Sequence, residues 1–206
     1  MSMRSLFAAA LLLMAAGGAA HAAETRTAVF AGGCFWCVES DFDKVPGVVE
    51  TVSGYTGGRT ANPTYEEVSY KDTGHREAVR VTYDPARVSY AQLVEYFWRT
   101  IDPVDAGGQF CDRGHSYTTA IYAADPEQKR IAEESRRALD ASGRLGKPVV
   151  TEIADAQPFY PAEAYHQDYK ERNGLKYRYY RYGCGRDARL EALWGQDALK
   201  LPAAGS

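Results

Sequence analysis

Hydrophobic and polar residues alternate in several short stretches of this chain, and a period of two is typical of strands. The alternation is clearest over residues 77–83, and it ends at the turn residues Asp84 and Pro85. Another apolar stretch, residues 48–55, stops at Thr56-Gly57-Gly58. The strands predicted on this basis span residues 25–31, 48–55, 77–83, 118–123 and 149–153.

Other segments carry apolar residues at helical spacing behind a capping residue. Ser89 precedes one such segment, in which Leu93 and Phe97 lie one turn apart, and Asp125 precedes a charged surface helix over 126–141. Shorter helices are predicted at 35–44 and 62–68, a loop at 102–114, and an irregular tyrosine-rich segment after 153 that wraps the core. Interleaved helices and strands without regular βαβ spacing predict the α+β class, as a two-layer α/β sandwich with a ferredoxin-like core.

The first 22 residues have the pattern of a secretory signal peptide. Arg4 precedes an uncharged apolar run over 6–16, and Ala20-His21-Ala22 fits the small-x-small pattern of a signal-peptidase site. The run is short for a bilayer span, with an uncleaved membrane anchor as the alternative. We therefore expect residues 1–22 to be cleaved and residues 23–206 to form a single domain. The protein is expected to be exported, to a bacterial periplasm, with no membrane attachment after cleavage.

The charge of the chain argues against a nucleic-acid partner. Its formal net charge is −3, which provides no overall attraction to nucleic acids or to anionic membranes. One tyrosine-rich segment is locally basic, and we interpret it as a solvated face. Its basic residues are Lys170, Arg172, Lys176, Arg178 and Arg181.

The segment Gly33-Cys34-Phe35-Trp36-Cys37 has the features of a reaction centre. It follows a predicted strand and begins a predicted helix, so Cys34 is expected beside unpaired backbone N–H groups that favour an anion. On this basis the thiolate of Cys34 should form more easily than that of a free cysteine. The four cysteines of an exported chain could also form two purely structural disulfides, but a domain of this size does not need disulfides for its stability.

From Gly-Cys-Phe-Trp onward the chain resembles the peptide methionine sulfoxide reductase A family. Similar motifs follow in the same order over roughly residues 26–195, nearly the whole mature chain. They include Gly54-Tyr55-Thr56-Gly57-Gly58, Asn62-Pro63-Thr64-Tyr65-Glu66-Glu67-Val68, Thr73-Gly74-His75-Arg76-Glu77-Ala78-Val79, Tyr83-Asp84-Pro85, Phe97-Trp98, Asp112-Arg113-Gly114 with Tyr117, Pro158-Phe159-Tyr160-Pro161-Ala162-Glu163 and His166-Gln167. A lone Cys-x-x-Cys is weak evidence, whereas many segments in series are specific.

The resemblance implies thiol-dependent reduction of the S epimer of methionine sulfoxide, in oxidised proteins and in the free amino acid. Cys34 would attack the sulfoxide sulfur, and Glu77 would donate a proton to the departing oxygen if burial keeps its carboxyl protonated. The resemblance further implies substrate-binding roles for Phe35, Trp36, Tyr65, Asp112 and Tyr117. Taken singly, these residues also permit structural roles: a solvated strand-end glutamate, packed aromatic rings and an Asx turn.

The resemblance implies that Cys34 becomes a sulfenic acid, which a second thiol converts to a disulfide. Cys184, between two glycines in the C-terminal part, is the preferred resolving cysteine, and Cys37 and Cys111 are the alternatives. Thioredoxin or a similar dithiol would then reduce the disulfide by exchange. The cycle requires no metal, flavin or nicotinamide, and we expect a monomer.

Two other functions remain to be distinguished. A thioredoxin-like disulfide oxidoreductase also places Cys-x-x-Cys between a strand and a helix, here as Cys34 and Cys37. The Phe-Trp pair inside the motif and the two glycines before it argue against that function. A zinc-binding module would need Cys34, Cys37, Cys111 and Cys184 or a histidine, but it lacks a second close cysteine pair.

Overall fold

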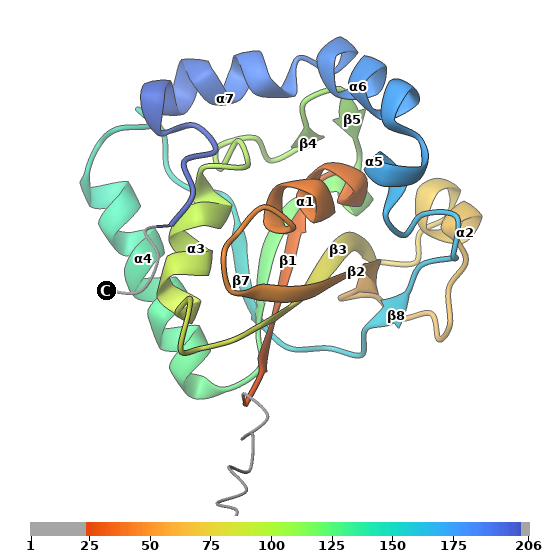
Figure 1. Ribbon diagram of the computed structural model, residues 1–206, viewed down its shortest axis with the longest axis horizontal. Coiled ribbons are helices and arrows are strands. Elements are labelled where there is room, and N and C mark those ends of the chain that lie inside the picture. The colour runs from red at the N-terminus through yellow and green to blue at the C-terminus, as the bar shows by residue number, and fades with distance from the viewer. Residues whose placement is uncertain (1–23, 203–206) are drawn as a thin grey trace, which may run out of the picture.

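The computed structural model describes residues 24–202, which fold around a six-stranded mixed sheet in the order β7-β6-β1-β3-β2-β8 (Figure 1). Neighbouring strands are antiparallel, except for the parallel pair of β6 and β7. The strands of the sheet are β1 (Arg26–Gly32), β2 (Val48–Thr56), β3 (Arg76–Tyr83), β6 (Thr119–Ala123), β7 (Glu152–Asp155) and β8 (Tyr160–Pro161). A separate hairpin is formed by β4 (Gly108–Gln109) and β5 (Asp112–Arg113).

Helices follow most of the strands. They are α1 (Phe35–Phe42), α2 (Tyr65–Tyr70), α3 (Tyr90–Trp98), α4 (Pro126–Ala141), α5 (Tyr169–Arg172), α6 (Gly174–Gly183) and α7 (Arg186–Trp194), with short 3₁₀ turns η1 (His115–Tyr117) and η2 (Gly195–Asp197). Thr64 and Ser89 close capping boxes at the starts of α2 and α3, and Asp125 caps α4 with Pro126 in its first turn. The capping residues therefore fix where these helices begin.

The period of two along the strands divides the sheet into two faces. On one face, Phe30 stacks between Phe42 of α1 and Phe97 of α3, with ring centroids 5.0 and 4.9 Å apart. On the other face, the neighbouring Ala31 packs with Tyr122 in a smaller cluster. The helices thus cover the face that carries the larger core, and the predicted α+β sandwich is confirmed.

Two sequence predictions need correction. The last strand expected at 149–153 begins three residues later, as β7, and pairs in parallel with β6. The segment 102–114 is largely loop, as expected, and the short β4–β5 hairpin lies within it. The C-terminal segment after residue 153 is largely helical rather than irregular, because α5, α6 and α7 lie there.

Buried ion pairs explain how these C-terminal helices are held. Arg181 of α6 donates to Asp41 of α1 at 2.9 Å and to Asp187 of α7 at 2.7 Å, and both Arg181 and Asp41 are buried. Arg181 is therefore not part of a solvated basic face, which corrects the interpretation of that segment. Arg186, also buried, donates to the carbonyl oxygens of Gly32 and Thr100. Buried charges persist only when they are paired or hydrogen-bonded, so these contacts fix α6 against α1, and α7 against the end of β1 and the segment after α3.

The predicted signal peptide, residues 1–22, lies outside the described residues. Between residues 24 and 202, none of the helices is both long enough and apolar enough to cross a membrane.

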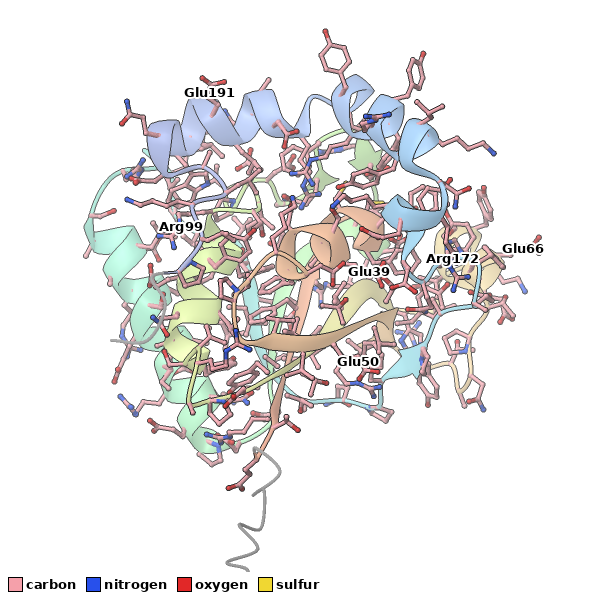
Figure 2. The ribbon with its side chains drawn as sticks, viewed as in Figure 1. Glu39, Glu50, Glu66, Arg99, Arg172 and Glu191 are labelled. Carbon is pink, nitrogen blue, oxygen red and sulfur yellow. A yellow bond between two sulfur atoms is a disulfide. The ribbon has the colours of Figure 1, made fainter. Side chains whose placement is uncertain are left out.

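Glu39 of α1 is a buried carboxyl whose Oε1 has no hydrogen-bond partner in the described part of the chain (Figure 2). Burial raises the pKa of Glu39 from 4.5 to about 7, and the carboxylate of Asp43 adds to the shift. A carboxyl with a raised pKa in the folded state contributes stability below about pH 4.5, and that contribution is lost as the pH rises to about 7.

We therefore expect Glu39→Gln to stabilise the protein at pH 8 by roughly 1–3 kcal/mol, because glutamine carries no charge to bury. At pH 4.5 the variant and the parent should differ much less. Urea denaturation at both pH values measures the difference. Equal gains at the two pH values would show that Glu39 is not protonated preferentially in the folded state.

Candidate active site at the N-terminus of α1

Cys34 lies where β1 ends and α1 begins. Gly33, in the left-handed region at φ 81°, makes the turn between them, and a Cβ at this position would lie 2.5 Å from the Cβ of Gln109. Cys34 is the N-cap residue of α1, and its side chain makes no capping hydrogen bond. The glycine turn thus presents the Cys34 sulfur at the positive end of the helix, as the sequence predicts.

The acidity of Cys34 differs from the sequence prediction. The residue is only 5 % exposed, and burial raises the pKa of its thiol well above the ordinary value. Cys37, one turn further along α1 and 1 % exposed, is the more acidic thiol of the two. A hydrogen bond from Cys34, together with the charges of Arg186 and Arg181, lowers the pKa of Cys37 to about 7. Of the two thiols, Cys37 is therefore the one that loses its proton first as the pH rises.

Glu77 faces the same helix terminus from β3. Its Oε2 accepts a hydrogen bond from the backbone N–H of Phe35 at 2.9 Å, and its side chain is buried. Burial raises the pKa of Glu77 to about 8. Hydrogen bonds from Phe35 and Tyr117 lower this pKa, but their effect is smaller than that of burial. The carboxyl is consequently protonated at neutral pH, which is the state that a proton donor requires.

Two tyrosines and an aspartate complete the polar side of the site. Tyr65, on α2, and Tyr117, on η1, lie close enough for the hydroxyl of each to shift the pKa of the other, and Tyr117 also lowers the pKa of Glu77. Burial raises the pKa of Tyr65 and of Tyr117, so both hydroxyls remain donors. Asp112, on β5, lies close enough for its charge to raise the pKa of Glu77. The structure thus gathers all three predicted side chains around Glu77.

Aromatic rings form the apolar side. Trp36 stacks on Tyr169 of α5, with centroids 3.7 Å apart and rings nearly parallel at 6°. The Nε1 of Trp36 donates to Nδ1 of His166 at 3.0 Å, and the His166 ring lies 5.0 Å from the ring of Phe35. The predicted pair Phe35 and Trp36 is therefore embedded in a wall of aromatic rings, which makes this side of the site apolar.

The sequence analysis missed the part of the site that α6 supplies. The hydroxyl of Tyr180 donates to Oδ2 of Asp112 and lies within hydrogen-bonding reach of the Cys34 sulfur. The ring of Tyr180 packs edge-on against Trp36, with centroids 5.6 Å apart. Its spacing of four residues from Cys184 is one available signal, but the many neighbouring tyrosines do not distinguish it.

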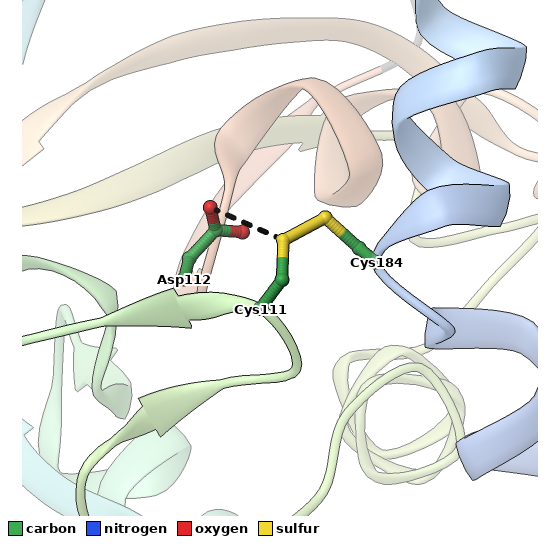
Figure 3. A group of neighbouring side chains, drawn as sticks. All are labelled: Cys111, Asp112 and Cys184. Carbon is green, nitrogen blue, oxygen red and sulfur yellow. Dashed lines mark hydrogen bonds between the residues drawn. A yellow bond between two sulfur atoms is a disulfide. The ribbon is translucent and has the colours of Figure 1, made fainter.

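Cys111 and Cys184 form a disulfide, with their Cα atoms 4.8 Å apart (Figure 3). The preferred resolving cysteine, Cys184, is thus bonded to the alternative Cys111 rather than being free beside Cys34. Oδ1 of Asp112 lies 3.7 Å from the Cys111 sulfur. Potential ligand atoms of these three residues lie within 4.8 Å of one another, but two of those atoms are the bonded sulfurs. Within residues 24–202, the free cysteines are Cys34 and Cys37, so the four cysteines form two separate pairs.

The arrangement combines a soft sulfur nucleophile, a protonated carboxyl and hydroxyl donors on one side with an aromatic wall on the other. Such a site can attack an electrophilic sulfur and protonate the oxygen bonded to it. Cys37, the second free thiol, lies one helical turn from the nucleophile and can close a disulfide with it.

Comparison with known proteins agrees with this chemistry. Residues 26–198 match the family described as peptide methionine sulfoxide reductase. The chain is 58% identical over 179 residues to a peptide methionine sulfoxide reductase MsrA 2 of Rhizobium meliloti, covering 87% of this chain and 88% of that one. The chain is also 56% identical over 192 residues to a peptide methionine sulfoxide reductase MsrA 2 of Caulobacter vibrioides, covering 92% of this chain and 96% of that one.

Solved structures show the same similarity. Methionine sulfoxide reductase A of Corynebacterium diphtheriae has a TM-score of 0.66 at 37% identity, over 76% of this chain and 78% of that one. The reduced form of Mxr1 from Saccharomyces cerevisiae has a TM-score of 0.69 at 26% identity, over 75% of this chain and 88% of that one.

Proposed function

The chain belongs to the peptide methionine sulfoxide reductase family, and on that premise we propose a catalytic role for each side chain around Cys34. The protein is a peptide-methionine (S)-S-oxide reductase, which uses thiols to reduce methionine sulfoxide to methionine. One observation supports the roles most strongly: Glu77, buried and protonated, is bonded to the same helix terminus that presents the Cys34 sulfur.

In the first step, the sulfur of Cys34 attacks the sulfoxide sulfur while its proton passes to the Cys37 thiolate. Glu77 protonates the sulfoxide oxygen, and the hydroxyls of Tyr65 and Tyr117 bind that oxygen as its negative charge grows. The bond between the two sulfurs then breaks as the hydroxyl oxygen passes from the methionine sulfur to the Cys34 sulfur, so that methionine leaves with its thioether restored and Cys34 becomes a sulfenic acid. Phe35 and Trp36 hold the S-methyl group during the attack.

Cys37 then resolves the sulfenic acid. Its sulfur attacks Cys34, a disulfide forms, and the oxygen departs as water. Cys37 is favoured over the first candidate, Cys184, because it is free, is hydrogen-bonded to Cys34 and has a pKa of about 7. A thiol with a pKa near ambient pH is a good attacking group.

The cycle closes when thioredoxin or a similar dithiol supplies two electrons. Every step moves electrons between sulfur atoms, so the reaction balances without a flavin, a nicotinamide or a metal. The substrates are oxidised proteins and free methionine sulfoxide, and the enzyme acts as a monomer. The signal-peptide pattern of residues 1–22 supports cleavage, export and work in a bacterial periplasm.

Single-turnover reduction of each sulfoxide epimer, without a reductant, tests this function. We expect the S epimer to yield methionine and the R epimer to yield none. Mass mapping of the oxidised protein should then find a new disulfide between Cys34 and Cys37. Reduction of the R epimer alone would overturn the assignment, and a Cys34–Cys184 bond would return the resolving role to Cys184.

A further inference from the structure

Glu163, which follows β8, joins two parts of the site that lie far from it in the sequence. Its Oε1 accepts a hydrogen bond from the backbone N–H of Tyr65 at 2.9 Å, and its Oε2 accepts one from the hydroxyl of Tyr55 at 2.8 Å. These partners lie 98 and 108 residues away along the chain. One carboxyl group therefore connects α2 to β2, at the end of the sheet where β8 lies (Figure 1).

Tyr65 is the first residue of α2, and its N–H is one of the helical donors that no carbonyl of the helix can accept. The capping box satisfies the N–H groups of Thr64 and Glu67 but not that of Tyr65. α2 has six residues, too few to be stable without tertiary contacts. The bond to Glu163 thus fixes the start of this helix, and with it the position of the Tyr65 side chain.

The other partner of Glu163 lies beside the proton donor in the sheet. Tyr55 of β2 pairs with Glu77 of β3 in the antiparallel register, so both side chains lie on the same face. Burial raises the pKa of Tyr65, and the charge of Glu77 raises it further, which places the Tyr65 hydroxyl close to that carboxyl. Glu163 therefore relates the start of α2 to the strand position that carries the proton donor.

The segment that carries Glu163 is itself firmly attached to β2. The side chain of Gln167 accepts a hydrogen bond from the N–H of Ser53 and donates one to the Ser53 carbonyl oxygen, each at 2.9 Å. On the other side of Glu163, the N–H of Ala162 donates to the same carbonyl oxygen at 2.9 Å. Gln167 also donates to the carbonyl oxygen of Ala162 at 2.8 Å. Glu163 is consequently a rigid point from which Tyr65 can be positioned.

The ionised state of Glu163 strengthens its hold on α2. Burial by itself would raise the pKa of Glu163, but the hydrogen bonds from Tyr65 and Tyr55 bring it below the ordinary value. A carboxylate is a stronger acceptor than a neutral group, and its charge is favourable at the positive end of a helix. Glu163 therefore stays ionised at neutral pH and holds Tyr65 without taking part in proton transfer.

We propose that Glu163 is a positioning residue for sulfoxide reduction, which holds the start of α2 so that the Tyr65 hydroxyl meets the sulfoxide oxygen beside Glu77. This inference rests on the proposed function, since it concerns a hydroxyl that binds that oxygen. A donor that stabilises growing charge loses much of its effect when it is displaced by about 1 Å. Loss of Glu163 therefore lowers the rate of the chemical step more than the affinity for the substrate.

Single turnover of the S epimer over a range of substrate concentrations tests this role. Glu163→Ala should lower the limiting rate by about tenfold or more, while the half-saturating concentration changes by less than about threefold. Glu163→Gln should stay within about threefold of the parent, because its amide can still accept from the Tyr65 N–H and donate to the Tyr55 oxygen. The control variant Glu66→Ala removes an exposed carboxylate from the first turn of α2 and should change neither value.

Glu163→Asp provides a second variant that keeps the charge. Its side chain is one methylene shorter, so the carboxylate cannot reach both partners at their present distances. We expect the limiting rate to fall by about threefold or more. If Glu163→Ala does not fold, Glu163→Asp takes its place in both experiments.

A double-mutant cycle with Tyr65→Phe separates positioning from a general loss of structure. If Glu163 acts through the Tyr65 hydroxyl, Glu163→Ala should slow the Tyr65→Phe variant by less than about twofold. Equal slowing by Glu163→Ala with and without that hydroxyl would overturn the proposal, as would a full limiting rate in Glu163→Ala. Failure of the parent to reduce the S epimer would instead contradict the proposed function, on which the inference rests.

Discussion

Replacing Cys34 with serine is expected to abolish methionine sulfoxide reduction, including the first turnover, because Cys37, the other free thiol of the described residues, lies one turn further along α1 rather than at its N-cap. A hydroxyl is a far weaker nucleophile toward sulfur than a thiolate. Rapid quench with one equivalent of enzyme should detect less than about a thousandth of the parent rate. Cys37→Ser should differ sharply: it turns over more slowly, because it lacks the thiolate that accepts the Cys34 proton, but it still releases one equivalent of methionine and then stops with Cys34 as a sulfenic acid.

This pair of variants also separates the enzyme from a thioredoxin-like disulfide oxidoreductase. In such a protein, both cysteines of Cys-x-x-Cys are needed for exchange, so each variant alone would be inactive. Trapping the sulfenic acid of Cys37→Ser with dimedone identifies the modified residue. Failure of Cys37→Ser to complete even one turnover, in a folded protein, would favour the disulfide oxidoreductase.

Replacing Glu77 with glutamine is expected to slow single turnover by roughly 10²–10⁴-fold, the usual contribution of a positioned acid. Glutamine keeps the size of the side chain and can still accept the bond from the Phe35 N–H, which is 2.9 Å long. It cannot donate the acidic proton that the departing oxygen needs. Stopped-flow or quench kinetics over a pH series measure the change.

The pH profile provides the clearest test of this role. The pKa of Glu77 is about 8, so the parent rate should fall as the pH rises above 8 and the acid is lost. On the acidic side, the rate should fall below about pH 7, because Cys37 then holds a proton and cannot accept that of Cys34. Glu77→Gln should lose the alkaline fall and keep the acidic one.

Glu39→Gln is a matched control, since it also removes a buried carboxyl with a raised pKa from the vicinity of α1. It should leave the rate and the pH profile of catalysis unchanged. If Glu77→Gln and Glu39→Gln reduced the rate equally, Glu77 would be a structural carboxyl rather than the proton donor.

The sequence predicts the sheet well where period-two patterning is strong. Along residues 77–83 of β3, successive side chains point to opposite faces of the sheet. Val79, Val81 and Tyr83 join the larger core under the helices, whereas Ala78 joins the smaller cluster on the opposite face. α6 escaped prediction because the side chains that it buries, Tyr177 and Arg181, do not form an apolar stripe. α6 has alternating arginine and tyrosine, and its attachment depends on the Arg181–Asp41 ion pair, whose members are 140 residues apart.

The site residues were predicted through motifs, and their states depend on the tertiary structure. Cys34 was expected to be acidic on the strength of the helix terminus alone, but the degree of burial that raises its pKa is set by residues from several elements. The shift of acidity to Cys37 depends on Arg181 and Arg186, which approach from the far end of the chain. The Cys111–Cys184 bond joins residues 73 positions apart, and spacing alone does not specify such a pairing.

The dependence of the site on α6 and α7 has a consequence for synthesis of the protein. A growing chain makes Cys34 and Cys37 early, but Arg181, Arg186 and Tyr180 only at its far end. Until those last helices dock, the two thiols lack the arginines and the cover that they have in the finished fold. The acidity of Cys37 and the burial of both thiols are therefore acquired only after the last part of the chain has been made.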